Sequence, residues 1–384
     1  MTPRSKHAWA ALALASASLF GCGGGDPVGP KVAISSITVA GDSLADVGTF
    51  GGMKFTIQKA SDPAAGYPVW PQLVANSFGL DGSAQCAAYS GNPQTGALSL
   101  SSSPGCDNYA VGGGRVNTVD PQKVGSPYLV ATQLRDRAAS GAFSANELLL
   151  VDGGGNDAAD LVGAYLAAAQ GDATTLFAML SSLLDASTLA QLQTADPTLG
   201  LAAGAYMQAL AGKLMNDIAT HAIANGAQRV MVVNVPDITL TPRFQAVLAG
   251  ITQAQSVAAA AQLQAGIRQW IGAFNTQLST LAAATPQVEV TDFYADFTDQ
   301  AANPSAYSLT NSTEASCPVV GQDSQGLPEY DFPTCADAAL NALPGKTAGW
   351  WERYAFSDGF HPTPYGHQLL AASVSRALAR AGWL

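Results

Sequence analysis

The chain has 384 residues, of which 48% are hydrophobic and only 12% are charged, and its formal net charge is −11. This length and composition supply enough apolar side chains for one large domain or two smaller ones. The acidic balance argues against nucleic acid as a partner, because phosphate binding requires clustered lysine and arginine.

The N-terminus has the features of an export signal. Two basic residues precede an apolar stretch over residues 8–20, which is too short to span a bilayer and has the length of a signal-peptide core. The sequence Leu-Phe-Gly-Cys that ends at Cys22 is similar to a bacterial lipobox, which predicts removal of residues 1–21 and lipidation of Cys22. The alternative is an ordinary signal peptide followed by an incidental cysteine.

Both alternatives predict an exported protein, either secreted or anchored as an outer-membrane lipoprotein in a bacterial cell envelope. Contact with the membrane is expected only through the lipid on Cys22. Residues 22–35 are rich in glycine and proline and are predicted to form a flexible tether.

The folded part is predicted to begin with a buried strand that ends in a serine. The β-branched run at residues 37–40 stops abruptly at Gly41, Asp42 and Ser43. Ligands of open α/β sheets bind beyond the carboxyl ends of the strands, so the Ser43 hydroxyl is placed where a ligand would lie. The alternative is that Asp42 and Ser43 only cap the next helix.

Four cysteines remain after the predicted signal peptide, and each close pair falls in a loop rich in serine, glycine and proline. An even number of cysteines in an exported protein indicates disulfides, and four cysteines allow three connectivities. Local pairing, Cys86 with Cys106 and Cys317 with Cys335, is the natural expectation. A metal site is the weaker alternative, since no CxxC or histidine-rich spacing accompanies these cysteines, and no metal is expected.

Predicted strands and helices alternate along the rest of the chain. An apolar stub at residues 108–111 is followed by three glycines, and the strong strand pattern at 147–151 ends in glycines before Asn156 and Asp157. The remaining elements are helices near 67–75, within 158–225, over 242–284 and from Thr363 onward, and strands at 229–235 and 288–293. This alternation predicts a three-layer α/β/α sandwich with a mostly parallel sheet.

We expect one domain over residues 36–384, with loop insertions near 81–107, 158–225 and 300–350. The helical insertion at 158–225 is long for one crossover connection. A lid over the site is a possible role for it.

One of the four histidines has a setting suited to catalysis. His361 lies in a loop just before a helix start, and Asp358 is three residues earlier across a glycine. Nucleophilic serine catalysis needs a base to take the hydroxyl proton and an acid to hold that base. Taken alone, the pair is equally a turn-stabilising feature. His7 falls in the signal, a surface or capping role is expected for His221, and a structural role is expected for His367.

These residues can converge along one sheet edge. Acyl transfer also needs donors aimed at the developing oxyanion. The backbone N–H groups of Ser43 and Gly113 and the side-chain amide of Asn156 would supply three, whereas Asp157 is expected to brace the loop.

Four sequence blocks resemble the signature blocks of the GDSL, or SGNH, hydrolase superfamily. They are Gly-Asp-Ser-Leu at 41–44, the stub with Gly113, Gly-Gly-Asn-Asp at 154–157, and Asp-Gly-Phe-His at 358–361, in that order. Further likeness to the bacterial outer-membrane esterase/lipase branch lies in Val-Pro-Asp at 235–237, Thr-Pro at 241–242, Phe-Asn at 274–275 and His-Pro-Thr at 361–363.

The resemblance implies a flavodoxin-like SGNH hydrolase fold and a serine esterase or lipase that needs no cofactor. It implies Ser43 as nucleophile, His361 as base and Asp358 as the group that orients the base. The implied substrate is a small-molecule or lipid ester, or a polymeric ester.

Two other functions stay open. An acyltransferase, or a deacylase of polysaccharides or polyesters, would use the same triad. A lipid-anchored binding protein with a degenerate hydrolase fold is the non-enzymatic alternative.

Overall fold

The computed structural model describes residues 33–101 and 105–384. The predicted signal peptide at 1–21 and Cys22 with its lipid lie outside the described residues, as does most of the predicted tether at 22–35. All three stay predictions.

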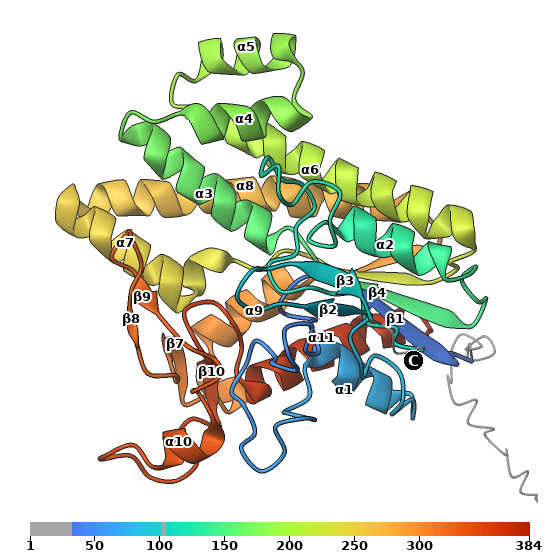
Figure 1. Ribbon diagram of the computed structural model, residues 1–384. Helices are drawn as coiled ribbons and strands as arrows, with labels where there is room; N and C mark the ends of the chain where they lie inside the picture. Colours follow the sequence, from blue (N-terminus) through green and yellow to red (C-terminus); the bar gives the residue numbers. More distant parts are fainter. Residues whose placement is uncertain (1–32, 102–104) are drawn as a thin grey trace, which may run out of the picture.

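The centre of the fold is a parallel four-stranded sheet (Figure 1). Its strands are β1 (Ser36–Ala40), β4 (Glu147–Val151), β5 (Val230–Val233) and β6 (Val288–Thr291). They pair in the order β1-β4-β5-β6. The predicted α/β class with a mostly parallel sheet is confirmed.

The side chains of β4 explain why this run of leucines forms a central strand. All five of its residues are buried, and successive side chains of a strand point to opposite faces. Leu149 and Val151 accordingly join the hydrophobic core on one face of the sheet, and Leu148 and Leu150 join the core on the other face.

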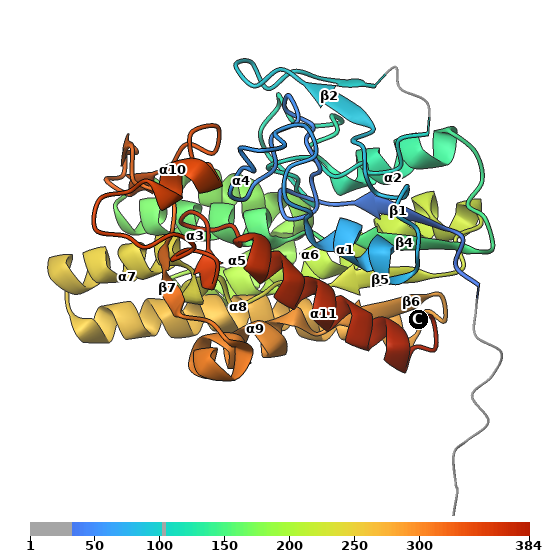
Figure 2. The ribbon, with the colours of Figure 1, turned by 90° about the horizontal axis from the view of Figure 1, so that it is seen from below.

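Helices cover both faces and complete the three layers (Figures 1 and 2). The helices on the first face are α2 (Val130–Ala139), α3 (Gly155–Ala169), α6 (Gly200–His221) and α8 (Val257–Ala283). The helices on the opposite face are α1 (Trp70–Ser77), α9 (Phe293–Ala302) and α11 (Pro364–Arg380). The last helix begins as the sequence predicts, with the Thr363 hydroxyl accepting the Gly366 N–H at 3.1 Å and a proline at its first position.

The apolar stub at 108–111 lies beside β1 as a further edge segment. Tyr109 N–H donates to Val39 O at 2.8 Å, and Val111 N–H donates to Gly41 O at 3.2 Å. The spatial order is then the 108–111 segment, β1, β4, β5 and β6. Numbered by their order along the chain, these five segments lie in the order 2-1-3-4-5, which is the order of flavodoxin-like sheets. The pairing carries the glycines that follow it to the end of β1.

The remaining elements lie in the predicted insertions and around them. They are the hairpin of β2 (Tyr89–Gly91) and β3 (Leu98–Leu100), α4 (Thr174–Leu183), α5 (Ala186–Ala195), α7 (Pro242–Ala254), β7 (Asn311–Ala315), β8 (Gly321–Gln322), β9 (Pro328–Glu329), α10 (Asp337–Asn341) and β10 (Tyr354–Phe356). Figure 1 shows α4 and α5 stacked beyond α3, away from the sheet. The region predicted as irregular at 300–350 therefore contains three short strands, a 3-10 helix at Pro304–Tyr307 and a short α-helix.

Both expected disulfides, Cys86–Cys106 and Cys317–Cys335, are present. Disulfides persist in oxidising compartments, which suggests an extracytoplasmic location. Within the two described ranges, no helix combines the length and hydrophobicity that crossing a membrane requires.

The end of β1 is held against β4 by a close approach that only glycine permits. Gln133 brackets Gly41, accepting from its N–H at 2.7 Å and donating to its carbonyl at 2.9 Å. A Cβ at this position would lie 1.7 Å from Asp152 Oδ1. The backbone of β1 therefore reaches the polar side chains of its neighbours without an intervening side chain.

We predict that Gly41→Ala destabilises the protein by about 2–4 kcal/mol, because Asp152 and the Asp42 amide must separate to admit a methyl group. Gly212→Ala is the matched control, since its Cβ would meet no atom within 4 Å in the interior of α6. That control should gain up to about 1 kcal/mol of stability. Urea unfolding of both variants measures the difference, and equal stabilities would contradict the close approach.

Candidate active site

A continuous hydrogen-bonded chain joins three side chains from opposite ends of the sequence. Ser43 Oγ lies 2.8 Å from His361 Nε2, and His361 Nδ1 lies 2.8 Å from Asp358 Oδ2. The other oxygen of Asp358 accepts the backbone N–H groups of Phe360 at 2.8 Å and His361 at 2.6 Å. The structure thus brings together the serine, histidine and aspartate that the sequence singled out.

Aromatic rings fix the orientation of the imidazole. The ring of Phe55 lies 5.2 Å from the His361 ring between centroids, and those of Phe332 and Phe360 meet it edge-on at 5.5 and 5.9 Å. The His361 side chain keeps 15% of its surface exposed. Packing on several sides therefore leaves the imidazole reachable while limiting its rotation.

The electrostatic setting favours a basic histidine. Burial alone would lower the pKa of His361, but the carboxylates of Asp358 and Asp42 outweigh it and raise that pKa above the ordinary 6.5. Burial would likewise raise the pKa of Asp358, but the attraction of His361 and its hydrogen bonds lower it instead. Asp358 is therefore ionised at neutral pH and stabilises a proton on His361.

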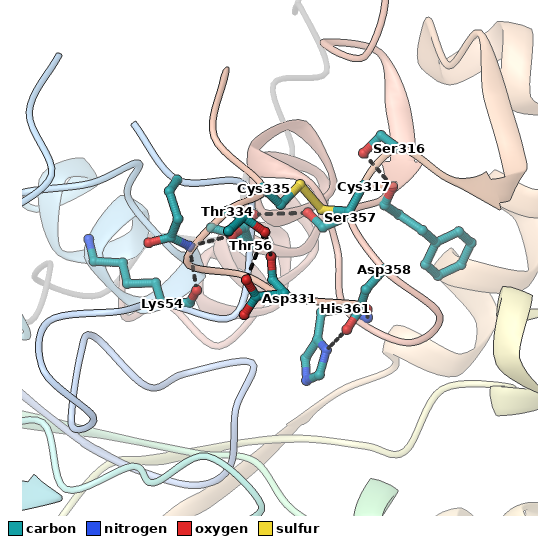
Figure 3. The surroundings of a disulfide bond; sticks show 12 residues. Lys54, Thr56, Ser316, Cys317, Asp331, Thr334, Cys335, Ser357, Asp358 and His361 are labelled. Atoms are coloured by element: carbon teal, nitrogen blue, oxygen red, sulfur yellow. Dashed lines mark hydrogen bonds and ion pairs between the residues drawn. A yellow bond between two sulfur atoms is a disulfide. The ribbon is translucent and has the colours of Figure 1, made fainter. Parts of the chain in front are cut away.

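The disulfide-bearing insertion holds the loop that carries Asp358. Figure 3 shows Cys317–Cys335 beside Ser357, the residue before Asp358. Cys317 N–H donates to Ser357 O at 2.7 Å, and Ser316 N–H donates to Phe356 O at 3.0 Å. Residues far from the reacting atoms thus set the position of Asp358.

Buried carboxyl groups stabilise the turn that carries Ser43. Asp42 N–H donates to Asp152 Oδ1 at 2.8 Å, and Asp42 Oδ1 accepts the Leu44 N–H at 2.9 Å. Burial raises the pKa of both carboxyls, and that of Asp152 rises furthest because Asp42 adds its charge. Both carboxyl groups thus hold the turn that carries Ser43 by accepting backbone N–H groups.

The backbone N–H groups of Ser43 and Gly113 have no acceptor in the described part of the chain. The flanking glycines use theirs, since Gly112 N–H donates to Asp46 Oδ2 and Gly114 N–H to Val111 O. Gly113 also has a φ of +77°, which glycine adopts without strain. Of the three glycines, only Gly113 has a free donor.

The side chain of Asn156 is anchored by one hydrogen of its amide. Its Nδ2 donates to Gly114 O at 3.0 Å, and Asn156 lies in the first turn of α3. An NH₂ group carries two hydrogens, so the second remains available to a ligand. The helix N-terminus adds a favourable field for negative charge at this place.

Neighbouring side chains brace the loop between Gly113 and α3. Asp157 accepts the N–H groups of Val116 at 3.0 Å and Asn117 at 2.8 Å, in line with the bracing role expected for it. Arg115 donates to Gly113 O and pairs with Asp160 at 2.5 Å. The sequence reasoning missed Arg115, although a charged residue directly after three glycines, in a chain with 17 lysines and arginines, was a usable signal.

The other two histidines within the described residues lie elsewhere. His367 is fully buried on α11, and burial lowers its pKa to about 3. His221 ends α6. No group of three or more histidine, cysteine, aspartate or glutamate side chains that could hold a metal ion occurs within residues 33–101 and 105–384.

A groove of about 1000 Å³ opens beside the site. Asn156, Asp358 and His361 lie at one part of its wall. Other parts of the wall come from α3, α4, α7, the loop at 115–123 and the β8–β9 hairpin, with Tyr206 of α6 and Phe360. No described residue of the 81–107 insertion lines it, so only two of the three predicted insertions border the site.

Comparison with known proteins identifies the family. The sequence model of the GDSL-like lipase/acylhydrolase family matches residues 37–374, nearly the whole described chain. The chain belongs to this family. The outer-membrane branch suggested by the finer motifs stays a prediction.

Two individual proteins are similar to this GDSL-like chain. The "Uncharacterized protein in trpE-trpG intergenic region" of Pseudomonas putida is 25% identical over 350 residues, which are 88% of this chain and 47% of that protein. The chain therefore spans about half the length of this relative. The lipase Lip_vut3 from a goat rumen metagenome matches in structure over 89% of this chain and 96% of its own, at 14% identity and a TM-score of 0.36.

The two disulfides offer a matched test of the support for Asp358. Their cysteines are 20 and 18 residues apart, so loss of either should cost a similar amount, about 3 kcal/mol on the chain-entropy model. We predict that replacing Cys317 and Cys335 by alanine also lowers kcat roughly tenfold or more, because Asp358 loses its backbone support.

Replacement of Cys86 and Cys106 by alanine is the control. Those cysteines lie in the insertion that does not line the groove, so kcat should stay within about twofold of the wild type. Thermal unfolding and ester hydrolysis at 20 °C below each variant's Tm would measure both effects. Equal kcat values in the two double variants would refute the assigned support.

Proposed function

We propose that this protein hydrolyses carboxylic esters with Ser43 as nucleophile, His361 as general base and Asp358 as the group that orients and stabilises the histidine. The observation that carries the proposal is the pair of 2.8 Å contacts linking Ser43 Oγ, the imidazole and the carboxylate. Nucleophile, base and orienter lie within hydrogen-bond reach in that order, which is the arrangement that activates a serine.

The first half of the reaction forms an acyl-enzyme. His361 Nε2 takes the Ser43 proton as Oγ bonds to the ester carbonyl carbon, and the carbonyl electrons move onto its oxygen. When they return, the bond to the alcohol oxygen breaks, and the departing alcohol takes the proton from His361. The negative charge of Asp358 stabilises the imidazolium between these two transfers.

The second half repeats the sequence with water. His361 removes a proton from water as its oxygen bonds to the acyl carbon, and Ser43 Oγ then leaves and recovers that proton. The products are a carboxylic acid, an alcohol and the free enzyme. No cofactor enters the balance of either half.

Three donors suit the oxyanion that forms in each half. They are the N–H groups of Ser43 and Gly113 and the second hydrogen of the Asn156 amide. The two backbone donors have no other acceptor among the described residues, so they need not break an existing bond to serve the transition state. Loss of one such donor costs about 10²–10³ in kcat in comparable sites.

Ser43→Ala tests the proposal directly. Because the triad acts as one unit, the variant should lose at least about 10³-fold in kcat on p-nitrophenyl acetate while unfolding at the same temperature as the wild type. Wild-type protein should also take up one equivalent of a fluorophosphonate, and the variant none. Full turnover by the variant would end the proposal, and failure of the wild type to turn over esters or to take the label would favour a binding protein.

The raised pKa of His361 predicts the pH profile. The neutral imidazole is the base, so kcat/KM should rise with pH and level off above a midpoint that lies higher than 6.5. Asp358→Asn removes the charge that raises this pKa, so the midpoint should fall and the plateau should drop by about 10²–10⁴-fold. An unchanged midpoint in Asp358→Asn would contradict the assigned pairing.

A further inference from the structure

The groove that includes His361 in its wall runs along one face of α3. Ala159, Gly163 and Leu166 follow Asn156 on this helix by three, seven and ten residues, and all four line the groove. Residues at these offsets share one side of an α-helix. The wall therefore leads from the proposed oxyanion donor up the length of the helix.

The chemistry at Ser43 determines which half of an ester lies on this wall. The leaving alcohol must receive its proton from His361 Nε2, so the alcohol lies on the His361 side of the carbonyl carbon. The carbonyl oxygen faces the donors at Gly113 and Asn156. The remaining substituent, the acyl chain, is then directed away from His361, and α3 is the wall of the groove that leads away from the donor Asn156.

The composition of this part of the groove suits an alkyl chain. Val162, Leu166 and, from α4, Met179 are apolar lining residues. The charged groups at its rim are paired with one another: Arg115 with Asp160 at 2.5 Å and Lys123 with Asp120 at 3.6 Å. An alkyl chain entering here would not leave a charge without its partner.

Gly163 keeps the groove open two helical turns from Asn156. A Cβ at Gly163 would meet no atom within 4 Å. The seven-residue separation corresponds to about 10 Å along the helix axis. A zigzag chain with carbon–carbon bonds of ~1.5 Å advances about 1.25 Å per bond, so roughly eight carbons span this distance.

We propose that the ester's acyl chain binds along α3 over Gly163, and that Gly163 is the specificity-determining residue that admits acyl chains longer than about eight carbons. The proposal rests on the proposed function, since it takes the acyl group to be bonded to Ser43. Gly163 acts by leaving space, so a larger side chain there shortens the chain that the groove accepts.

The experiment compares Gly163→Phe with the wild type on p-nitrophenyl esters from acetate to palmitate. The variant should keep acetate and butyrate turnover within about twofold and lose kcat/KM by tenfold or more on laurate and palmitate, since several methylenes lose their burial. Gly163→Leu, which substitutes a strong helix former, repeats the test if the phenylalanine variant folds poorly. Gly212→Phe on α6, outside the groove, is the matched control and should keep the wild-type profile.

A second ester series assigns the chain to one side of the carbonyl. Acetate esters of alcohols of increasing length should be hydrolysed equally well by the wild type and Gly163→Phe. A loss confined to long alcohols would place the alcohol on α3 and overturn the proposal, as would an unchanged acyl profile or an equal loss on every ester.

The outcomes are separable from failure of the proposed function. If Ser43 takes up the fluorophosphonate and short esters are hydrolysed while the acyl profile of Gly163→Phe stays unchanged, only the acyl assignment fails. If Ser43 is unreactive in the wild type, the proposed function itself fails, and the acyl assignment falls with it.

Discussion

The hydrogen bond between Ser43 and His361 joins residues that are 318 positions apart, and the rest of the structure serves to hold its two ends. One end depends on the sheet, because the parallel pairing of β1 with β4 and the close approach at Gly41 place the serine turn. The other end depends on the loop after β10, which is tied to β7 and to the Cys317–Cys335 disulfide. Both supports together bring these distant segments to a contact of 2.8 Å.

The buried carboxyl groups around Ser43 show how the site manages charge. Asp42, Asp152 and Asp157 are each nearly or fully inaccessible, and burial raises the pKa of all three, that of Asp157 to about 7. The free-energy cost of burying these carboxyl groups is offset by the hydrogen bonds that they accept from backbone N–H groups. The same hydrogen bonds position the turn at Ser43 and the loop before α3. The carboxyl group of Asp358 differs from these three, because its pKa is lowered. Its negative charge therefore lies next to His361.

The insertions have different relations to this site. The hairpin of β2 and β3 with its disulfide stands apart from the groove, whereas the segment at 300–350 both supports Asp358 and supplies the β8–β9 wall. The helical region after Asn156 contributes the opposite wall through α3 and α4. An α/β core that places the reacting atoms is thus combined with added segments that shape the space around them.

The sequence by itself determined the features that local patterns encode. Apolar runs with abrupt polar ends marked the strands, Thr363 and Pro364 marked the last helix, and Ser43, Asn156 and the Asp358–His361 pair stood at such ends. These could be predicted because strand periodicity, helix caps and short motifs depend on neighbours in the chain. Only the tertiary structure decided which of the three glycines has a free N–H group. It also decided that Arg115 and Gln133 hold the backbone at the site. It likewise placed α3 opposite the β8–β9 hairpin across the groove. Those features arise from contacts between segments far apart in the chain, and no local pattern of residues encodes which distant segment will lie opposite.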